Sequence, residues 1–418
     1  MRLENGKYWI NDKIDPLDLV QTYGVPTYVY DTSIMKDHYD RLCSAFKGVR
    51  RLKINYACKA LTNINIVRFF KNLGSGLDTV SIQEVLIGLK AGFDPHDIMY
   101  TPNGVSIEEF TKAKNLGVRI NIDNLEILDQ FGSLYSDHPV SIRINPHIMA
   151  GGNAKISVGH IDSKFGISIH QMDEVLEIIQ KHEMRVEGVH MHTGSDILDV
   201  DVFSRAAQVL LNTAKKFKNL DFLDFGSGFK VPYKLGDVHT NIEYLGEKIT
   251  AQFNEFIKEY GKDLELIFEP GKFLVSEAGY LLARVNVIKQ SMTKVFAQLD
   301  SGQNHLLRPM FYDAFHKIIN ISNTDGPKKI YDVVGYICET DTFGVNREIN
   351  EIHPNDILAF RNAGAYCFMM SSNYNSRFRP AEVLVHEGDH YLIRKRETMD
   401  DILRNQIEIK ELKPLNLA

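Results

Sequence analysis

The sequence predicts an α/β protein built on a (β/α)8 barrel. Between about residues 50 and 280, eight short β-rich runs alternate with amphipathic helical stretches. Eight alternations within roughly 230 residues are typical of such a barrel, although an open doubly wound sheet produces a similar string. With 418 residues, the chain is also long enough for a barrel plus a smaller domain.

The helices between these runs carry their own start and stop signals. Ser81 with Glu84, and Ser106 with Glu109, have the spacing of a capping box, in which a hydroxyl and a carboxylate bind free backbone amides. Gly92 follows an apolar helical stretch and is expected to end it. The eight strand candidates are KINYA (53–57), GLDTV (76–80), DIMYT (97–101), RINID (119–123), SIRIN (141–145), EGVHMH (187–192), FLDFG (222–226) and LIFEP (266–270).

The pattern changes after residue 280, where apolar runs such as YLLARVNVI and EVLVHEGDHYLI are separated by turn residues. This predicts a C-terminal all-β domain. The run TYVYD (27–31) is a further strand candidate, so we expect the β domain to take in N-terminal strands as well. The predicted division is therefore N-terminal strands in 1–30, the barrel in 31–280 and the β domain in 281–418.

Composition argues against several classes of partner. Lys plus Arg is 48 and Asp plus Glu is 54, so a net charge of −6 provides no basic field for nucleic acid. The four cysteines are widely spaced without a CxxC pair, which indicates neither a disulfide framework nor a zinc site. The N-terminus lacks an apolar core, and no segment is long enough to span a bilayer. We expect a cytoplasmic protein that contacts neither membranes nor nucleic acid.

Barrel enzymes hold their active sites at the carboxyl ends of the strands, and chemically active side chains fall there. A lysine at such a position can form a Schiff base with an aldehyde, of which pyridoxal phosphate (PLP) is the best-known protein-bound example. The residues gathered at this rim are Lys59, Asp78, Arg143, His192, Gly226 to Gly228 and Glu269.

Each of these residues also has a simpler explanation when taken alone. A lysine after a strand is usually a surface residue, a GxG is usually a tight turn, and His190 with His192 could bind a metal. In the PLP interpretation, the GSG turn approaches a phosphate and Glu269 pairs with a protonated pyridine nitrogen. The joint placement of these groups favours the PLP interpretation, with no metal.

Several motifs occur in the order and spacing of a known family. They are YACKA, GLDTVSIQE, HMHTGSDI, LDFGSGF, EPGKF, YICETD, AGAY and SSNYNSR. The chain resembles the barrel-type (fold type III) PLP-dependent decarboxylases, with an alanine racemase-like barrel, from about residue 25 to 400. Within that family it is most similar to the branch that converts meso-2,6-diaminopimelate to L-lysine and CO2. The resemblance implies a homodimer with active sites at the subunit interface.

The resemblance also implies roles for individual residues. Lys59 would hold PLP, His192 would stack on its ring, Glu269 would pair with its nitrogen, and Cys338 would return a proton from the other subunit. The expected cofactor contacts are Lys59, Asp78, His192, Ser195, Gly226, Gly228, Glu269, Gly271 and Tyr366. The expected substrate contacts are Lys272, Arg308, Tyr312, Glu339 and Tyr366.

Two departures from the family's usual motifs affect these expectations. EPGR is EPGK here, so Lys272 keeps a positive charge but lacks the planar fork that clamps a carboxylate. The usual triple glycine is replaced by GSG in this sequence.

Other interpretations of the sequence are a decarboxylase of ornithine, lysine, arginine or carboxynorspermidine, a racemase on the same barrel, or a cofactor-free regulator. Arg308 with Glu339 favours a substrate that carries both charges at its far end.

Overall fold

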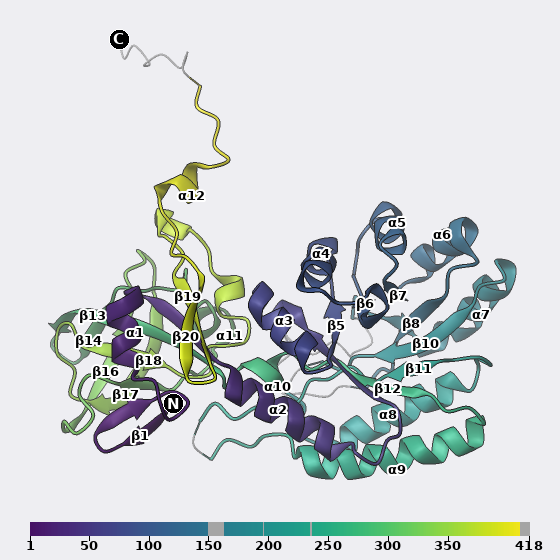
Figure 1. Ribbon diagram of the computed structural model, residues 1–418, viewed down its shortest axis with the longest axis horizontal. Coiled ribbons are helices and arrows are strands. Elements are labelled where there is room, and N and C mark those ends of the chain that lie inside the picture. Colours follow the sequence, from purple (N-terminus) through teal and green to yellow (C-terminus); the bar gives the residue numbers. More distant parts are fainter. Residues whose placement is uncertain (149–162, 195, 235, 410–418) are drawn as a thin grey trace.

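A closed barrel of eight parallel strands forms one half of the computed structural model, which describes residues 1–148, 163–194, 196–234 and 236–409 (Figure 1). Neighbouring strands pair in chain order, and β8 also pairs with β10, which closes the sheet. A two-residue strand, β9 (Ile167–Ser168), pairs with β8 at the rim. The barrel strands are β4 (Leu52–Ala57), β5 (Gly76–Thr79), β6 (Ile98–Tyr100), β7 (Arg119–Ile122), β8 (Val140–Asn145), β10 (Val186–Met191), β11 (Phe222–Asp224) and β12 (Glu265–Phe268).

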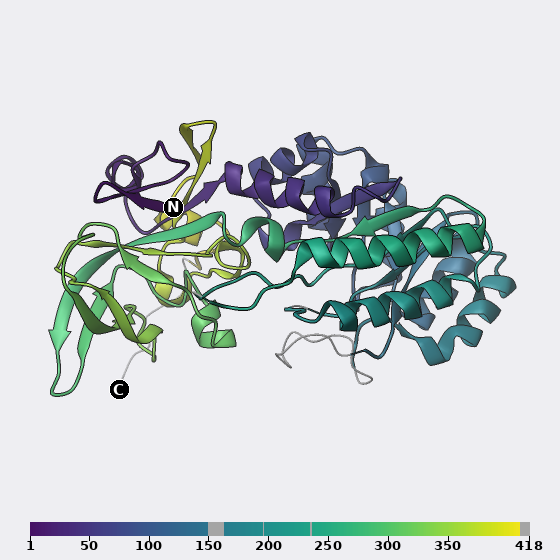
Figure 2. The same cartoon turned by 90° about the horizontal axis from the view of Figure 1, so that it is seen from below.

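Each barrel strand is followed by a helix on the outside, and α2 (Thr32–Ala45) leads into the first strand. Figure 2 shows α9 and α8 running side by side along one flank of the barrel. All eight predicted strands are confirmed, and the (β/α)8 prediction with them. The helices are α3 (Ile64–Asn72), α4 (Ile82–Ala91), α5 (Ile107–Asn115), α6 (Leu125–Tyr135), α7 (Met172–Lys181), α8 (Val200–Ala214), α9 (Ile242–Tyr260) and the short α10 (Lys272–Val275).

The predicted capping boxes are only partly correct. Ser81 accepts the amide of Glu84 as predicted, but the Glu84 carboxylate binds the amide of Val80 instead of that of Ser81. Ser106 precedes α5 without capping an amide through its side chain, and the Glu109 carboxylate accepts the hydroxyl of Tyr100 at 2.6 Å. A buried tyrosine hydroxyl needs a partner, and it takes this carboxylate out of the cap. Gly92 ends α4 in the left-handed conformation, as expected.

The barrel strands are apolar on both faces because one face meets the helices and the other fills the interior. Tyr56 of β4 stacks on Phe70 of α3, with ring centroids 4.1 Å apart. Met99, Phe222 and Ile267 form a separate buried cluster, contributed by β6, β11 and β12. Gly188 leaves the room that the Phe222 ring occupies, because a Cβ there would lie 2.2 Å from that ring. The barrel is therefore a packed apolar core, with a few buried polar side chains such as Asn121 and Ser141, which are hydrogen-bonded to each other.

The other half of the molecule is a nine-stranded sheet domain. Its central strand β13 (Gly279–Gln290) pairs with β3 (Thr27–Asp31) along its first half and with β14 (Val295–Leu299) along its second. β3 pairs on its other side with β19 (Ala381–His386), so the prediction that an N-terminal strand joins the C-terminal domain is confirmed. The remaining strands are β15 (Ile318–Asn320), β16 (Lys328–Val334), β17 (Thr342–Asn350), β18 (Ile357–Phe360) and β20 (Asp389–Arg394).

Smaller elements complete the chain. At the N-terminus, β1 (Arg2–Glu4) and β2 (Lys7–Trp9) form a separate two-stranded sheet before α1 (Pro16–Tyr23). The sheet domain carries α11 (Arg308–Tyr312) and α12 (Met399–Leu403). Among the described residues, no helix combines the length and the apolar character that crossing a bilayer requires.

A buried carboxylate joins the barrel to the sheet domain. Glu382 of β19 is fully buried and accepts the Tyr30 hydroxyl at 2.8 Å and the Asn63 side-chain amide at 3.2 Å. Arg394 of β20 supplies the positive charge. Asn63 also caps the N-terminus of α3 in the barrel. One charged group thus connects β3, β19, β20 and the first barrel helix.

Replacing Glu382 tests this connection. Glu382→Ala leaves Arg394, Tyr30 and Asn63 without their acceptor, so we expect a loss of about 2–4 kcal/mol in unfolding free energy. Glu382→Gln keeps the shape and one acceptor and should lose less. Urea denaturation followed by circular dichroism measures both variants, and equal stability of Glu382→Ala and wild type would contradict the role of this carboxylate.

Candidate active site

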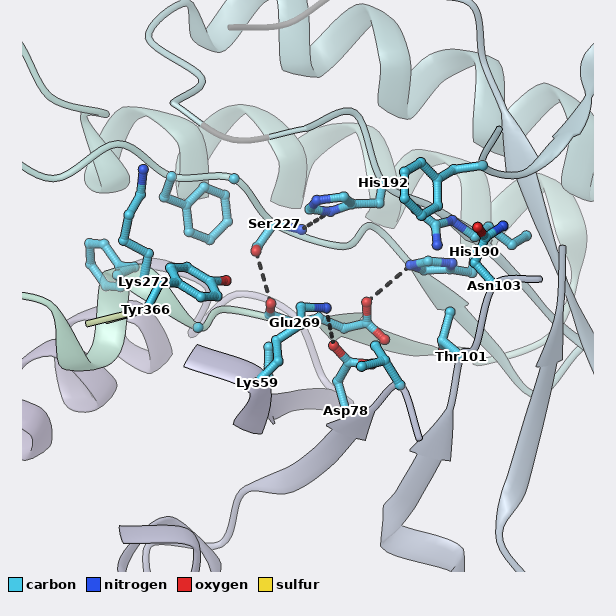
Figure 3. Close-up of a pocket in the computed structure, with 18 of the residues that line it drawn as sticks. Lys59, Asp78, Thr101, Asn103, His190, His192, Ser227, Glu269, Lys272 and Tyr366 are labelled. Atoms are coloured by element: carbon cyan, nitrogen blue, oxygen red, sulfur yellow. Dashed lines mark hydrogen bonds and ion pairs between the residues drawn. The ribbon is translucent and has the colours of Figure 1, made fainter. Parts of the chain in front are cut away.

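A cavity of about 390 Å³ opens at the carboxyl ends of the barrel strands. Figure 3 shows Lys59, Asp78 and Glu269 on its floor, with Lys272 and Tyr366 at one side and Thr101, Asn103 and His190 at the other. Of the predicted site residues, the lining contains Lys59, Asp78, His192, Gly228, Glu269, Gly271, Lys272 and Tyr366. The structure thus brings most of the predicted rim residues into one cavity.

Lys59 lies in a single 3-10 turn, Cys58–Ala60, immediately after β4. Its Nζ is 3.0 Å from the buried Oδ2 of Asp78 at the tip of β5, and its side chain remains 41% exposed, open to the cavity. Enclosure alone would lower the pKa of Lys59, but the negative charges of Asp78 and Glu269 outweigh it and raise that pKa. The amine is therefore stored as an ammonium beside a carboxylate and faces the cavity.

Glu269 follows β12 and is buried at the floor. Its Oε2 accepts the Nε2–H of His190 at 3.0 Å. Although burial opposes ionisation, His190 and Lys59 hold the pKa of Glu269 below its usual range. The other oxygen, Oε1, has no donor among the described residues. A buried anion is thus present where a protonated ring nitrogen would need one.

The glycine-bearing turn after β11 brings backbone to the cavity. Gly226 and Gly228 flank Ser227 after β11, with φ of +61° and +116°, which favours glycine. A Cβ at Gly228 would lie 2.0 Å from the carbonyl of Gly194, so this close approach excludes any side chain. Ser227 donates its hydroxyl to the Glu269 carbonyl at 2.8 Å, so that proton is not available to a ligand.

Tyr366 is held in a conformation unusual for a tyrosine, with φ of +58°. Its amide donates to the carbonyl of Ala60 at 2.8 Å, which ties this sheet-domain loop to the turn that carries Lys59.

His192, just beyond β10, lies above the floor with Nδ1 3.4 Å from the amide nitrogen of Ser227 (Figure 3). Burial and the charge of Arg143 lower the pKa of His192, so its ring is neutral.

Lys272, the departure from EPGR, is paired within the protein. Its Nζ contacts Oδ1 of Asp196, and the side chain of Lys272 is 9% exposed. Burial lowers the pKa of Lys272, against the opposing effect of Asp196. A substrate carboxylate would therefore have to compete with Asp196 for this amine.

Arg308 and Tyr312 lie at the two ends of α11, outside the cavity lining. The Arg308 guanidinium is 5.8 Å from the ring of Tyr233 and 5.7 Å from that of Tyr312. Its buried Nε has no hydrogen-bond partner among the described residues. The Tyr233 hydroxyl lies 2.9 Å from that of Ser276, directly after α10, so the arginine lies on the Lys272 side of the site.

Cys338 and Glu339 lie apart from this cavity, exposed on the turn between β16 and β17. The Asn375 side chain donates to Cys338 Sγ at 3.3 Å, and the Tyr374 hydroxyl to Glu339 at 2.6 Å. Within one chain, the structure does not bring these two residues to Lys59. Ser195, expected to bind phosphate, lies outside the described residues.

Sequence reasoning missed several residues of the site. Asp224, in the LDF run before the glycines, faces Glu269, and Asp196, in the TGSD run, pairs with Lys272. Both stand beside recognised motifs, and their position there was the only available signal. Asn103 and Phe165 also line the cavity, but their surroundings in the sequence carry no signal of a site.

The arrangement suits a small anionic carbonyl compound. The Lys59 amine could react with the carbonyl group, and the backbone at the GSG turn could approach the anionic group. Comparison with known proteins agrees. Residues 33–276 match the family described as pyridoxal-dependent decarboxylase, pyridoxal binding domain. The diaminopimelate decarboxylase of Methanothermobacter thermautotrophicus is 40% identical, covering 95% of this chain and 96% of the relative. That of Aquifex aeolicus is 35% identical, covering 94% of each chain.

Solved structures agree with these relatives over nearly the whole chain. Diaminopimelate decarboxylase from M. jannaschii, in co-complex with L-lysine, has a TM-score of 0.90 at 29% identity and covers 98% of both chains. The Helicobacter pylori enzyme complexed with L-lysine has a TM-score of 0.85 at 34% identity, covering 93% of this chain and 98% of its own. From its fold, its rim residues and these relatives, the chain belongs to the pyridoxal-dependent decarboxylase family.

Proposed function

We propose that this protein is a PLP-dependent carboxy-lyase that converts meso-2,6-diaminopimelate to L-lysine and CO2, as the last step of lysine formation. The observation that carries the proposal is Lys59 at the tip of β4, beside Asp78 and across the cavity floor from the buried anion of Glu269. Curated relatives named diaminopimelate decarboxylase, at 34–40% identity over most of the chain, support the same substrate.

The residues present fit the cofactor. Asp78 Oδ1 is a buried acceptor without a partner among the described residues, and the ionised Glu269 keeps lone pairs beyond the bond from His190, so the floor has capacity for donors from a ligand. Gly228 and Gly271, from the GSG and EPGK turns, bring backbone into the cavity lining, as phosphate binding requires. We infer that Lys59, Asp78, His192, Glu269 and Tyr366 hold PLP together with these turns.

The chemistry that PLP supplies when bound is capture of the substrate's amine by its aldehyde and acceptance, by its ring, of the electron pair released with CO2. Lys59 would hold the aldehyde until the substrate's amine replaces it. Glu269 would keep a proton at the ring nitrogen. His192 would exclude water from one face, since its neutral ring has little need of solvation.

The substrate's far end would lie toward α11. There Arg308 has a buried Nε without a partner, and it would bind the distal carboxylate with Tyr312 beside it. Lys272 would add positive charge, weakened by Asp196. Glu339 would accept the distal ammonium.

Cys338 and Glu339 can serve this site only from a second subunit, because within one chain they lie away from the cavity. We therefore include a homodimer in the proposal. Phe311, Tyr374 and Phe378 are 50%, 44% and 37% exposed, and Tyr374 is bonded to Glu339, which supports an interface on this side. The four free cysteines suit the reducing cytoplasm.

Product analysis tests the activity itself. PLP-loaded protein should release lysine and CO2 from meso-diaminopimelate, and it should release no amine product from ornithine, lysine, arginine or carboxynorspermidine. The physical reason is that the other amino acids lack a distal carboxylate for Arg308. Chromatography identifies the products. Turnover of another substrate in place of diaminopimelate would overturn the assigned specificity.

Arg308→Gln tests the distal clamp. Loss of a charge-assisted bond should raise KM for diaminopimelate about 10- to 100-fold. Inhibition by lysine, which has no distal carboxylate, should change less than about threefold on the same reasoning. Arg284→Gln, on an exposed arginine of β13, is the matched control. If binding of diaminopimelate and binding of lysine weakened equally, Arg308 would not be the residue that binds the distal carboxylate.

Cys338→Ala tests proton delivery across the interface. We expect lysine formation to fall at least about 100-fold while the PLP dissociation constant stays unchanged, because a general acid acts on rate and not on cofactor binding. Mixing Cys338→Ala subunits with Lys59→Ala subunits should restore about a quarter of wild-type activity, since half of randomly paired dimers carry one intact site. No restoration would mean that Cys338 serves its own subunit or no site.

A further inference from the structure

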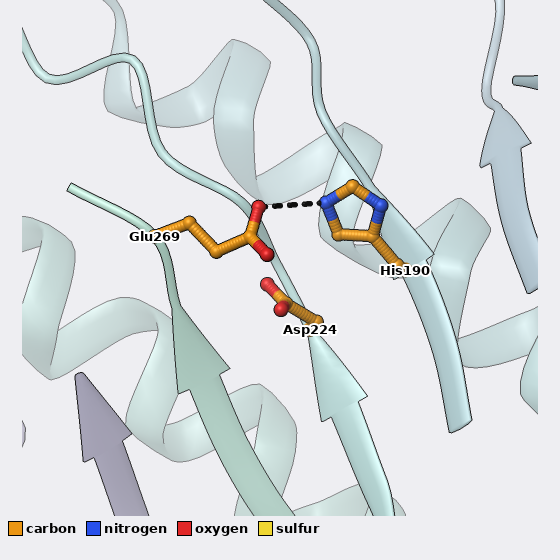
Figure 4. A group of neighbouring side chains, drawn as sticks. All are labelled: His190, Asp224 and Glu269. Carbon is orange, nitrogen blue, oxygen red and sulfur yellow. Dashed lines mark hydrogen bonds and ion pairs between the residues drawn. The ribbon is translucent and has the colours of Figure 1, made fainter. Parts of the chain in front are cut away.

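Three buried side chains meet at the cavity floor: His190 and Glu269, which line it, and Asp224, which does not (Figure 4). They are 1%, 1% and 7% exposed, and one potential ligand atom from each lies within 4.8 Å of the other two. Such a group can hold a metal ion or can share protons. The hydrogen bonds of His190 decide between these possibilities.

Both ring nitrogens of His190 are engaged. The Asn121 side-chain nitrogen donates to Nδ1 at 2.8 Å, and Nε2 donates to Glu269 Oε2 at 3.0 Å. Burial lowers the pKa of His190, so its ring is neutral, and the Glu269 carboxylate that faces Nε2 can only accept a hydrogen bond. His190 therefore has its proton on Nε2 and no free lone pair for a metal ion. The group is a hydrogen-bond network.

Asp224 faces Glu269 with one oxygen left over. Its Oδ1 accepts the amide of Gly226 at 2.8 Å. Its Oδ2 and Glu269 Oε1 are buried, and neither has a donor among the described residues. Figure 4 shows these two carboxyl groups directed at each other. Two ionised carboxylates cannot face one another in a buried site without a large cost, so one of them carries a proton.

The proton belongs on Asp224. Glu269 already accepts a hydrogen bond from His190 and lies near the Lys59 ammonium, and both favour its ionised form. Asp224 has only the Gly226 amide, and burial together with the charge of Glu269 raises the pKa of Asp224. The side chain that keeps its proton is thus the one turned away from the cavity.

We propose that Asp224 is a positioning residue that donates a proton from Oδ2 to Glu269 Oε1 and, with His190, fixes Glu269 as an ionised carboxylate aimed into the cavity. This inference rests on the proposed function, in which Glu269 pairs with the ring nitrogen of PLP. Two donors on different oxygens prevent the carboxylate from turning, and they leave lone pairs for the ring N–H. Asp224 itself touches neither cofactor nor substrate.

Two substitutions separate this role from a purely structural one. Asp224→Asn keeps both bonds, because an amide nitrogen donates to Glu269 and an amide oxygen accepts from Gly226. Asp224→Ala removes both. We expect the PLP dissociation constant, measured by absorbance titration, to rise about 10- to 100-fold in Asp224→Ala and to stay within about threefold of wild type in Asp224→Asn.

An infrared measurement follows the proton directly. The carbonyl band of a protonated carboxylic acid should be present in the wild-type protein at neutral pH and absent from Asp224→Asn. This comparison needs only the isosteric variant, so it remains decisive even where Asp224→Ala does not fold. An unchanged spectrum would overturn the proposal, as would equal weakening of PLP binding in both variants or in neither.

Asp31 provides the matched control. It is 2% exposed, accepts a backbone amide at the start of α2, and lies outside the cavity lining, so Asp31→Asn and Asp31→Ala should leave PLP affinity unchanged.

Lysine formation by the wild-type protein separates this proposal from the proposed function. If wild type binds PLP and forms no lysine, the proposed substrate fails while the Asp224 comparison stands. Normal PLP binding by Asp224→Ala in a lysine-forming enzyme rejects the positioning role alone.

Discussion

Closure of the barrel is the constraint on which the rest of the molecule depends. Once β8 pairs with β10, all eight strands point the same way, and all eight carboxyl ends meet at one rim. Backbone bonds continue past the strands: the Glu269 amide donates to the Gly226 carbonyl at 2.8 Å, and the Ala57 amide to the Pro270 carbonyl at 3.2 Å. Residues as far apart in the sequence as Ala57 and Pro270 are thereby held against one another at this rim.

The rim concentrates buried charge, and the structure balances it in pairs. Lys59 with Asp78, Lys272 with Asp196, and His190 with Glu269 each combine a donor or cation with a carboxylate. A buried charge without a partner is costly, so each pair stabilises a group that the packed barrel below could not accept.

The sequence predicted the strands well because strands covered on both faces read as apolar runs with polar ends. It also placed Lys59 and Glu269 at the rim, because all strands of a parallel barrel end at the same rim and a residue at a strand end must therefore lie there. It could not locate Asp224 or Asp196, because their importance comes from the side chain opposite, Glu269 or Lys272, which lies far away in the sequence. The second capping box was wrong for a similar reason, as Tyr100 competes for Glu109.

The place of β3 between β13 and β19 has a consequence for synthesis of the chain. The TYVYD strand leaves the ribosome before the whole barrel, but its two neighbours begin only at Gly279 and Ala381. The barrel can therefore close while β3 still has both edges open, and an apolar strand with free edges is prone to pair with other chains. Completion of the sheet, and with it the burial of Glu382, must wait until β19 has been synthesised, long after the barrel.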